Sequence, residues 1–133
     1  MPGTLEGILR LAADRHASDI FLASNAPVQI KVNGTLFPLS ERRLQPQEPL
    51  ELLREMVPAA DLAVLERDHE LNSAISMENV GRFRLSAFVQ RGTVAAVLRY
   101  VSYKKPSFES LNLPKSLIDL VMERRGLILM AGA

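Results

Sequence analysis

The sequence has 133 residues, of which 47% are hydrophobic and 23% charged, a size and composition that fit one compact domain with a single core. Sixteen basic residues against fifteen acidic ones give a formal net charge of +1, so no overall field draws the chain to nucleic acid or to anionic lipid. The absence of cysteine excludes disulfides and thiolate metal sites, and the absence of a secretory signal or of an apolar run near the roughly 20 residues that cross a bilayer indicates a cytoplasmic protein.

The N-terminal segment has apolar residues at helical spacing. These residues are Leu5, Ile8, Leu9 and Ala12. With Thr4 as N-cap, the spacing predicts an amphipathic helix that ends near His16 and packs one face on a sheet. The residues from Asp19 to Ser24 are typical of a short strand, which the turn-forming residues 25–27 would end.

An Asn-Gly pair marks the clearest hairpin of the sequence. Apolar and polar residues alternate from Val28 to Val32, and Asn33-Gly34 then leads into a second strand from Thr35 to Leu39. This dipeptide suits the left-handed positions of a two-residue turn, so the two strands are predicted to pair. The polar, proline-containing residues from Ser40 to Pro49 predict a surface connection.

Two helices and three further strands complete the first part of the chain. The helices are predicted at residues 50–57 and 59–67, and Pro58 would separate them. The strands are predicted at residues 70–76, 81–90 and 93–101, with turns at Asn79 and Gly92. Strands joined by such short turns pair antiparallel, because parallel pairing needs a crossover of about a dozen residues or more. The expected fold class is therefore α+β, with a mainly antiparallel sheet and flanking helices.

The composition changes after Val101, where the polar residues 102–110 are typical of a linker. A helix is predicted next. It would hold Pro114 in its first turn, Leu117, Leu120 and Val121 in its apolar stripe, Arg124 and Arg125 at its C-terminus and Gly126 at its C′ position. Residues 127–131 form a short apolar run typical of a strand buried on both faces of a parallel sheet. Because such a strand needs neighbours that the chain does not contain, residues 111–133 are predicted to begin a larger α/β domain that continues beyond this sequence.

The sequence contains no arrangement of side chains that would make the chain catalytic by itself. It has no Ser/His/Asp, Cys/His or paired-carboxylate pattern, and His16 and His69 are too far apart and too isolated to indicate a metal site. A phosphate-binding loop needs several glycines, a lysine and a Ser or Thr. Only the preceding apolar run and a possible first glycine, Gly132, followed by Ala133, are present here.

Three arginines of the last two predicted strands form the most informative pattern. Alternation puts Arg82 and Arg84 on the same face of the sheet, and a hairpin would put Arg99 beside Arg84. Clustered guanidinium groups repel one another unless an anion or carboxylates lie between them, and their forked geometry matches phosphate oxygens. Two hypotheses remain open from the pattern. In the first, a nucleotide phosphate binds there; in the second, which is the commoner arrangement, the arginines solubilise the outer face or pair with Glu70 and Glu78.

Six segments, taken in order, resemble the PilT/PilU family of type IV pilus retraction motors, a branch of the secretion ATPases. They are Ala17–Leu22 (ASDIFL), Val28–Gly34 (VQIKVNG), Gly81–Phe88 (GRFRLSAF), Val97–Tyr100 (VLRY), Leu111–Pro114 (LNLP) and Arg125–Leu129 (RGLIL). Within the family, residues 69–72 (HELN) and 88–91 (FVQR) resemble PilU more than PilT.

The resemblance implies three parts of the chain and a set of contacts. A PAS-like N-terminal domain would span residues 1–101, and a linker would span residues 102–110. Residues 111–133 would be the start of a RecA-like ATPase domain. The sequence would break off at the Walker A phosphate loop, of which Gly132 and Ala133 would be the first residues. Six identical subunits would form a ring, with ATP and Mg²⁺ bound between the domains of the complete protein and not held tightly by this part alone. In such motors, arginines of the N-terminal domain approach the nucleotide phosphates. The matching positions here are Arg84 and Arg99, with Arg82 as a third.

The function that the resemblance implies is regulation and nucleotide sensing within a motor ATPase that powers pilus retraction in twitching motility. The implied partners are a second retraction ATPase and a platform protein of the inner membrane, and no nucleic acid is implied. The motor would act in the cytoplasm of a bacterial cell, at the inner face of that membrane. Two alternatives stay open. The chain could be a non-catalytic module that packs subunits into the ring, or a PAS-like sensor of a small molecule, although its predicted core positions contain no polar cluster to orient one.

Overall fold

Residues 4–132 are described by the computed structural model, and their first element is helix α1, Leu5–Asp14. Two side-chain oxygens cap its N-terminus by accepting hydrogen bonds from backbone amides. The Gly7 amide donates to Thr4 Oγ1 at 3.2 Å, and the Leu5 amide donates to Glu55 Oε2 at 2.6 Å. Amides at a helix start have no partner within the helix, so each acceptor stabilises this end. The predicted helix and its N-cap are confirmed, with the helix ending two residues before His16.

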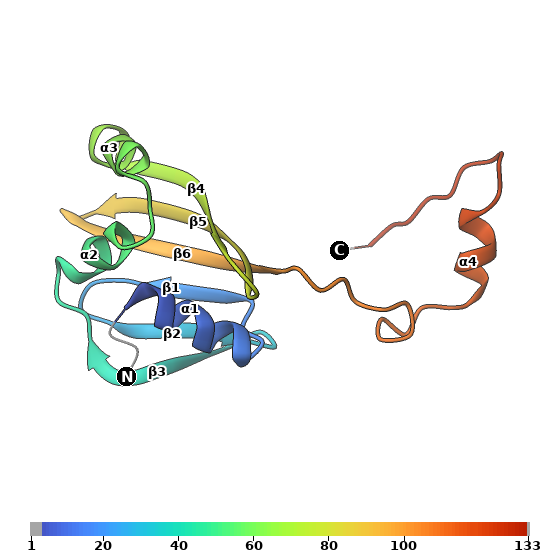
Figure 1. The fold of residues 1–133 in the computed structure, drawn as a ribbon, viewed down its shortest axis with the longest axis horizontal. Coiled ribbons are helices and arrows are strands. Elements are labelled where there is room, and N and C mark those ends of the chain that lie inside the picture. Colours follow the sequence, from blue (N-terminus) through green and yellow to red (C-terminus); the bar gives the residue numbers. More distant parts are fainter. Residues whose placement is uncertain (1–3, 133) are drawn as a thin grey trace. The chain divides into compact units, whose positions relative to one another are not determined.

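Six strands form one antiparallel sheet in the order β3-β2-β1-β6-β5-β4 (Figure 1). The strands are β1 Asp19–Leu22, β2 Pro27–Val32, β3 Thr35–Arg43, β4 Glu70–Met77, β5 Gly81–Gln90 and β6 Thr93–Ser102. Strand β1 pairs with β2 on one side and with β6 on the other. It therefore joins the N-terminal hairpin to the β4-β5-β6 meander, and the expected α+β class is confirmed.

The tight turns have the backbone that their residues predicted. Asn33 has φ 48° and Gly34 has φ 82°, so both central positions of the β2–β3 turn are left-handed, as an Asn-Gly hairpin requires. The β4–β5 turn contains Asn79 at φ 60°, and the β5–β6 turn contains Arg91 at φ 52° followed by Gly92 at φ 76°. These turns fix which residues face each other across the meander.

Strand β3 is longer than predicted, because residues 40–43 continue the strand instead of forming a surface connection. Its pairing with β2 shifts between Pro27 and Gln29 and then resumes where Pro27 faces Arg43. Pro38 lacks an amide hydrogen, but β3 is an edge strand and tolerates the missing donor. Residues 40–43 are all polar, a composition that suits an exposed sheet edge as well as a loop, whereas Pro46 and Pro49 of the predicted connection lie beyond the strand.

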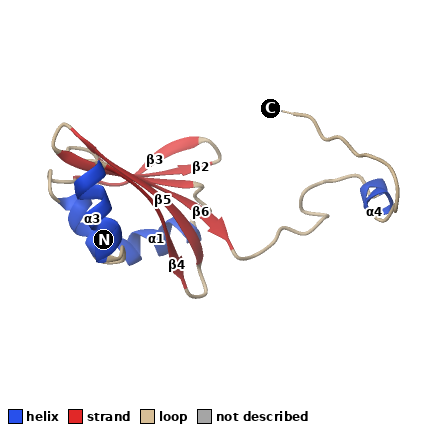
Figure 2. Ribbon diagram, turned by 90° about the horizontal axis from the view of Figure 1, so that it is seen from above, coloured by secondary structure: helices blue, strands red, loops and turns tan. Residues whose placement is uncertain are grey.

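The helices and the core lie on one face of the sheet. Helices α2 (Glu48–Arg54) and α3 (Ala59–Asp68) are separated by Pro58, as predicted, and Figures 1 and 2 show them with α1 on the same side of the strands. In β5 the buried residues alternate with exposed ones: Phe83, Leu85 and Ala87 enter the core, whereas Arg82, Arg84 and Ser86 face the opposite way. The helix-free face is therefore the one that carries the arginines.

The chain divides into two units between Tyr103 and Lys104. The second unit contains helix α4, Ser116–Val121, and none of its residues is buried. The prediction of a longer helix ending at Arg124 and Arg125, with Gly126 at C′, is wrong, since Met122 is the C-cap. A helix this short gains little from its own hydrogen bonds, and α4 has no packed face that would extend it.

The predicted strand at residues 127–131 is not formed in the described structure. Leu127, Leu129 and Met130 are each more than 80% exposed. A strand exists only through a hydrogen-bonded neighbour, and none of the six strands pairs with this segment. Gly132 follows it in irregular backbone, and Ala133 lies outside the described residues. Among residues 4–132, no helix is long and apolar enough to cross a membrane.

Gly81 begins β5 at a place where an aromatic ring covers the backbone. A Cβ atom there would lie 2.5 Å from Tyr100 Cε2 and 2.9 Å from the carbonyl oxygen of Val101. The ring itself is held by a contact with Phe83, with ring centroids 5.1 Å apart, and by a hydrogen bond of 2.8 Å from Tyr100 Oη to the Val80 carbonyl. The ring therefore cannot move aside without losing both interactions.

We expect Gly81→Ala to lower the free energy of unfolding by about 1–3 kcal/mol, because the added methyl group displaces the Tyr100 ring from its packed position. Urea unfolding followed by circular dichroism measures the change. Gly132→Ala is the control, since no heavy atom lies within 4 Å of its Cβ position. Equal stability of the two variants would contradict the tight packing at Gly81.

Candidate functional site

A row of directly opposed residues crosses five strands on the helix-free face. Following the register from β4 to β2, its members are Ala74, Arg84, Arg99, Asp19 and Lys31. All of them share one face because residues that face each other across a strand pair point to the same side of the sheet. The row therefore brings together charged side chains that lie up to 80 positions apart in the sequence.

The expected placement of the arginines is confirmed by the β5–β6 register. Arg84 lies directly opposite Arg99, and Arg82 lies two positions before Arg84 on the same face. Within the described part of the chain, neither Arg82 nor Arg84 forms an ion pair. Two adjacent guanidinium groups without carboxylate partners leave this side of the row positively charged.

The hypothesis that the arginines pair with Glu70 and Glu78 is contradicted for residues 4–132, whereas the hypothesis that they only solubilise the face is not tested by these contacts. Neither glutamate forms an ion pair with an arginine there. Glu70 faces Phe88 at the far end of β5, away from Arg84, and Glu78 lies in the β4–β5 turn. The carboxylate that reaches the arginines comes from β1 instead.

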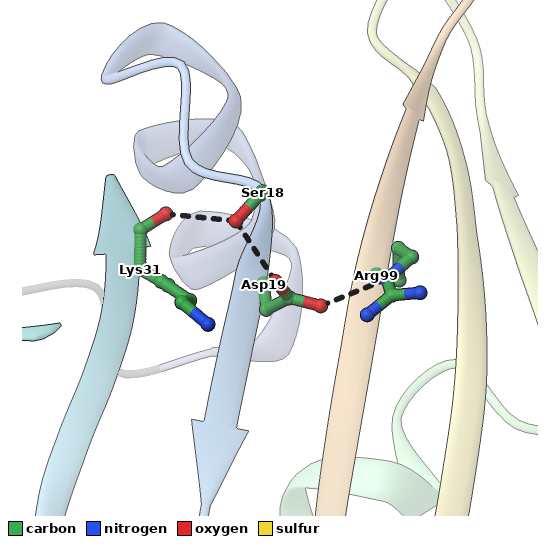
Figure 3. Close-up of polar contacts among 4 residues, drawn as sticks. All are labelled: Ser18, Asp19, Lys31 and Arg99. Atoms are coloured by element: carbon green, nitrogen blue, oxygen red, sulfur yellow. Dashed lines mark hydrogen bonds and ion pairs between the residues drawn. The ribbon is translucent and has the colours of Figure 1, made fainter. Parts of the chain in front are cut away.

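Asp19 is that carboxylate, and its two oxygens have different partners (Figure 3). Arg99 Nε donates to Asp19 Oδ1 at 3.0 Å, and Ser18 Oγ donates to Asp19 Oδ2 at 2.8 Å. The Asp19 side chain is 9% exposed, whereas the Arg99 side chain is 67% exposed. A nearly buried carboxylate thus anchors a guanidinium group whose far end reaches solvent.

The pKa of Asp19 lies below its ordinary value of 3.8. Burial raises this pKa, but the hydrogen bond from Ser18, the hydrogen bond and charge of Arg99 and the charge of Lys31 together outweigh burial. Asp19 is therefore ionised at neutral pH, and its negative charge lies between two cations of the row.

A hollow of about 810 Å³ covers the arginine end of the row. Asp19, Arg82, Arg84 and Arg99 line it together with the polar side chains of Asn72 and Ser86. Three cations and one carboxylate give this surface a positive charge, and the guanidinium forks have the shape that phosphate oxygens accept. In the described residues, no group of three or more His, Cys, Asp or Glu side chains could hold a metal ion.

Sequence reasoning located the arginines but missed Asp19 as their partner. The alternation within β5 and the short β5–β6 turn were enough to place Arg84 beside Arg99. The local pattern places Asp19 only at the start of a strand, because nothing in it indicates that β1 pairs with β6. The local signal is a pair of polar residues, Ser18 and Asp19, between the apolar Ala17 and Ile20.

Comparison with known proteins gives three curated relatives, each matched over nearly all of this chain. The chain is 37% identical over 128 residues to the type IV pilus ATPase PilU of Pseudomonas aeruginosa, a match that covers 96% of this chain and 34% of PilU. It is 26% identical over 125 residues to the type IV pilus retraction ATPase PilT of the same organism, covering 94% and 36%. The uncharacterized protein YggR of Escherichia coli K12 is 31% identical over 129 residues, covering 97% and 39%. This chain thus spans little more than a third of each relative.

Solved structures agree with this result. The crystal structure of the pilus retraction motor PilT with bound ADP matches with a TM-score of 0.73 and 32% identity, over 90% of this chain and 35% of that one. The Legionella pneumophila ATPase DotB matches with a TM-score of 0.77 over 95% of this chain and 38% of that one, and its 22% identity supports the fold alone. No protein-family model matches the chain.

We expect Asp19→Asn to lower the free energy of unfolding by about 1–3 kcal/mol at neutral pH, because the nearly buried ion pair with Arg99 is replaced by the weaker hydrogen bond of a neutral amide oxygen. The pKa of Asp19 is lower in the folded chain than the ordinary 3.8, so its stabilising effect is complete above that value. The effect disappears as the pH falls through the still lower folded pKa. The two proteins should therefore converge in stability in strong acid.

Urea titrations of both proteins from neutral pH to below pH 3 measure this difference. Asp68→Asn is the matched control, since Asp68 also pairs with an arginine, Arg67, but at an exposed position where the effect should be much smaller. A difference between the unaltered chain and Asp19→Asn that stays constant down to the lowest pH would contradict the ionised pair.

Proposed function

The chain belongs, over the third of the family's length that it spans, to the PilT/PilU family of type IV pilus retraction ATPases, and we propose that it is the N-terminal, nucleotide-sensing domain of a longer motor ATPase. The longer protein would hydrolyse ATP to drive pilus retraction. Residues 1–101 would form the sensing domain, of PAS-like type, residues 102–110 a linker, and residues 111–133 the beginning of the ATPase domain.

The observation that carries this proposal is the pair formed by Arg84 and Arg99, directly opposite on β5 and β6. Like charges in that position destabilise a sheet, so their presence calls for a compensating anion. Asp19 balances one of them through the Arg99 Nε group. The remaining positive charge, together with that of Arg82, suits the phosphates of a nucleotide.

In the proposed mechanism the arginines act when the two domains close on ATP. Phosphoryl transfer spreads negative charge over the phosphate oxygens, and a cation placed beside them stabilises the transition state. The arginines belong to one domain and the phosphate-binding loop would belong to the other. Because the stabilisation then depends on domain closure, hydrolysis and domain movement are coupled. The only carboxylate that lines the described hollow is Asp19, and both of its oxygens already accept hydrogen bonds, so the Mg²⁺ that accompanies ATP would be held by the ATPase domain.

The proposed assembly is a ring of six identical subunits. Its partners would be a second retraction ATPase and a platform protein of the inner membrane, with the motor at the cytoplasmic side of that membrane. The PilT structure with bound ADP supports the choice of nucleotide. The higher identity to PilU than to PilT supports a role of the PilU kind.

A second candidate function is subunit packing alone. It is favoured by two apolar side chains at the helix-free face, Phe88 and Val101, which are 38% and 45% exposed. On this hypothesis the arginines would only keep the face soluble. The two functions differ in what happens to ATP turnover when the ring is intact.

In the full-length protein that this proposal predicts, we expect Arg84→Ala and Arg99→Ala each to lower ATP turnover by a factor of the order of a hundred, because each removes a phosphate-stabilising cation. Turnover is measured by phosphate release, and the oligomer mass by light scattering on the same samples. Arg54→Ala on α2, on the opposite side of the sheet, is the control and should turn over ATP normally. Intact rings with unchanged turnover in the Arg84 and Arg99 variants would reject nucleotide sensing and favour subunit packing.

A further inference from the structure

We propose that Asp19 is a positioning residue, which holds Arg99 by its Nε atom so that the two terminal amino groups of the guanidinium face a phosphate. This inference rests on the proposed function, because it takes phosphate as the ligand of the arginine face. It adds a role for a carboxylate where the ligand itself is negatively charged.

The hydrogen bonds of Arg99 divide its guanidinium group into an anchored part and an available part. Nε donates to Asp19 Oδ1 at 3.0 Å, and no hydrogen bond joins Nη1 or Nη2 to any of residues 4–132. Figure 3 shows one terminal nitrogen of Arg99 directed away from Asp19 and the other on the Asp19 side of the group, with the dashed line joining Asp19 only to Nε. Because Nε lies at the inner end of the group, an acceptor there leaves the forked end open for a bidentate contact.

The anchor is itself held in place by neighbouring strands. Ser18 Oγ donates to Asp19 Oδ2 at 2.8 Å and also lies 3.3 Å from the Lys31 carbonyl oxygen. The Ser18 backbone is fixed on both sides, since its amide donates to the Lys31 carbonyl at 2.8 Å and its carbonyl accepts from the Tyr100 amide at 3.0 Å. The carboxylate therefore has little freedom to follow a moving arginine.

The position of Asp19 in the row also opposes the repulsion between the arginines. Arg99 lies between Arg84 on β5 and Asp19 on β1, so one neighbour repels its charge and the other attracts it. Without the carboxylate, the long and mostly exposed side chain would gain rotamer freedom and turn away from Arg84. With it, two guanidinium groups stay on adjacent strands in one orientation, and the ligand need not order them.

Two physical effects of Asp19 on anion binding have opposite signs. Its negative charge, close to the hollow, repels a phosphate by Coulomb interaction, so removing it would strengthen binding. Its anchoring of Arg99 lowers the ordering cost of binding, so removing it would weaken binding. The direction of the change therefore separates the two effects.

The test is the affinity of the 133-residue chain for inorganic tripolyphosphate at neutral pH, measured by calorimetric titration at low salt. We expect Asp19→Asn, which keeps the shape of the side chain, to bind about fivefold more weakly than the unaltered chain. Glu6→Gln is the matched control, because it removes one negative charge and breaks the exposed ion pair with Arg10 on α1. It should leave the affinity unchanged.

A second background tests whether the effect passes through Arg99. The lysine ammonium group has neither the inner Nε–H donor nor the planar, forked pair of amino groups of a guanidinium. In Arg99→Lys, Asp19 therefore has no guanidinium group to orient. Asp19→Asn should then cause no further weakening, which a double-mutant cycle reveals as coupling between the two residues. Equal weakening by Asp19→Asn in both backgrounds would overturn the positioning role.

The remaining outcomes are equally decisive. Tripolyphosphate binding by Asp19→Asn that is as tight as, or tighter than, that of the unaltered chain would overturn the positioning role while leaving the phosphate contact in place. If the unaltered chain does not bind tripolyphosphate, both the contact and the positioning role are wrong. Should Asp19→Asn fail to fold, Ser18→Ala keeps the carboxylate and removes the hydrogen bond to Oδ2, together with the longer contact of 3.3 Å between Ser18 Oγ and the Lys31 carbonyl oxygen. It is expected to weaken binding in the same direction and by less, and an unchanged affinity would overturn the proposal.

Discussion

The pairing of β1 with β6 is the contact on which the rest of the domain depends. β1 has only four residues, yet it lies between β2 and β6 and joins the two halves of the sheet. Closing this contact orders a long stretch of intervening chain, a cost in entropy that grows only slowly with loop length. The burial of Ile20 and Leu22 on its inner side offsets that cost.

The core of the domain sets the geometry of its charged face. Ile20 faces Leu98 on the inner side of the sheet. The adjacent pair in the register, Asp19 and Arg99, therefore faces the outer side. A slip of one residue in this register would turn the apolar side chains outward and separate the ion pair at the same time. Hydrophobic burial thus determines which charged groups of the opposite face lie side by side.

Local signals in the sequence were sufficient for most of the first unit. Thr4, Asn33-Gly34 and Pro58 act through the backbone of their own neighbourhood, and the placement of Arg84 beside Arg99 needs only a short turn and a period of two. The partnership of Asp19 with Arg99 was not predictable, because it depends on two strands 80 positions apart coming together. The extension of β3 beyond Leu39 was missed because residues 40–43 are all polar, and an exposed edge strand has the same composition as a loop. The long helix and the strand predicted after residue 110 needed packed neighbours, which the described residues do not supply.

The strand that carries Arg99 is also the one through which the first unit continues into the second. β6 is paired with β5 along all ten of its residues and with β1 over part of its length. Tension applied along β6 from its C-terminal end acts at right angles to those hydrogen bonds, so the rungs of the ladder share the load in shear instead of opening one after another. Such a connection is mechanically stiff, and a pull on it reaches Arg99 with little loss along the strand.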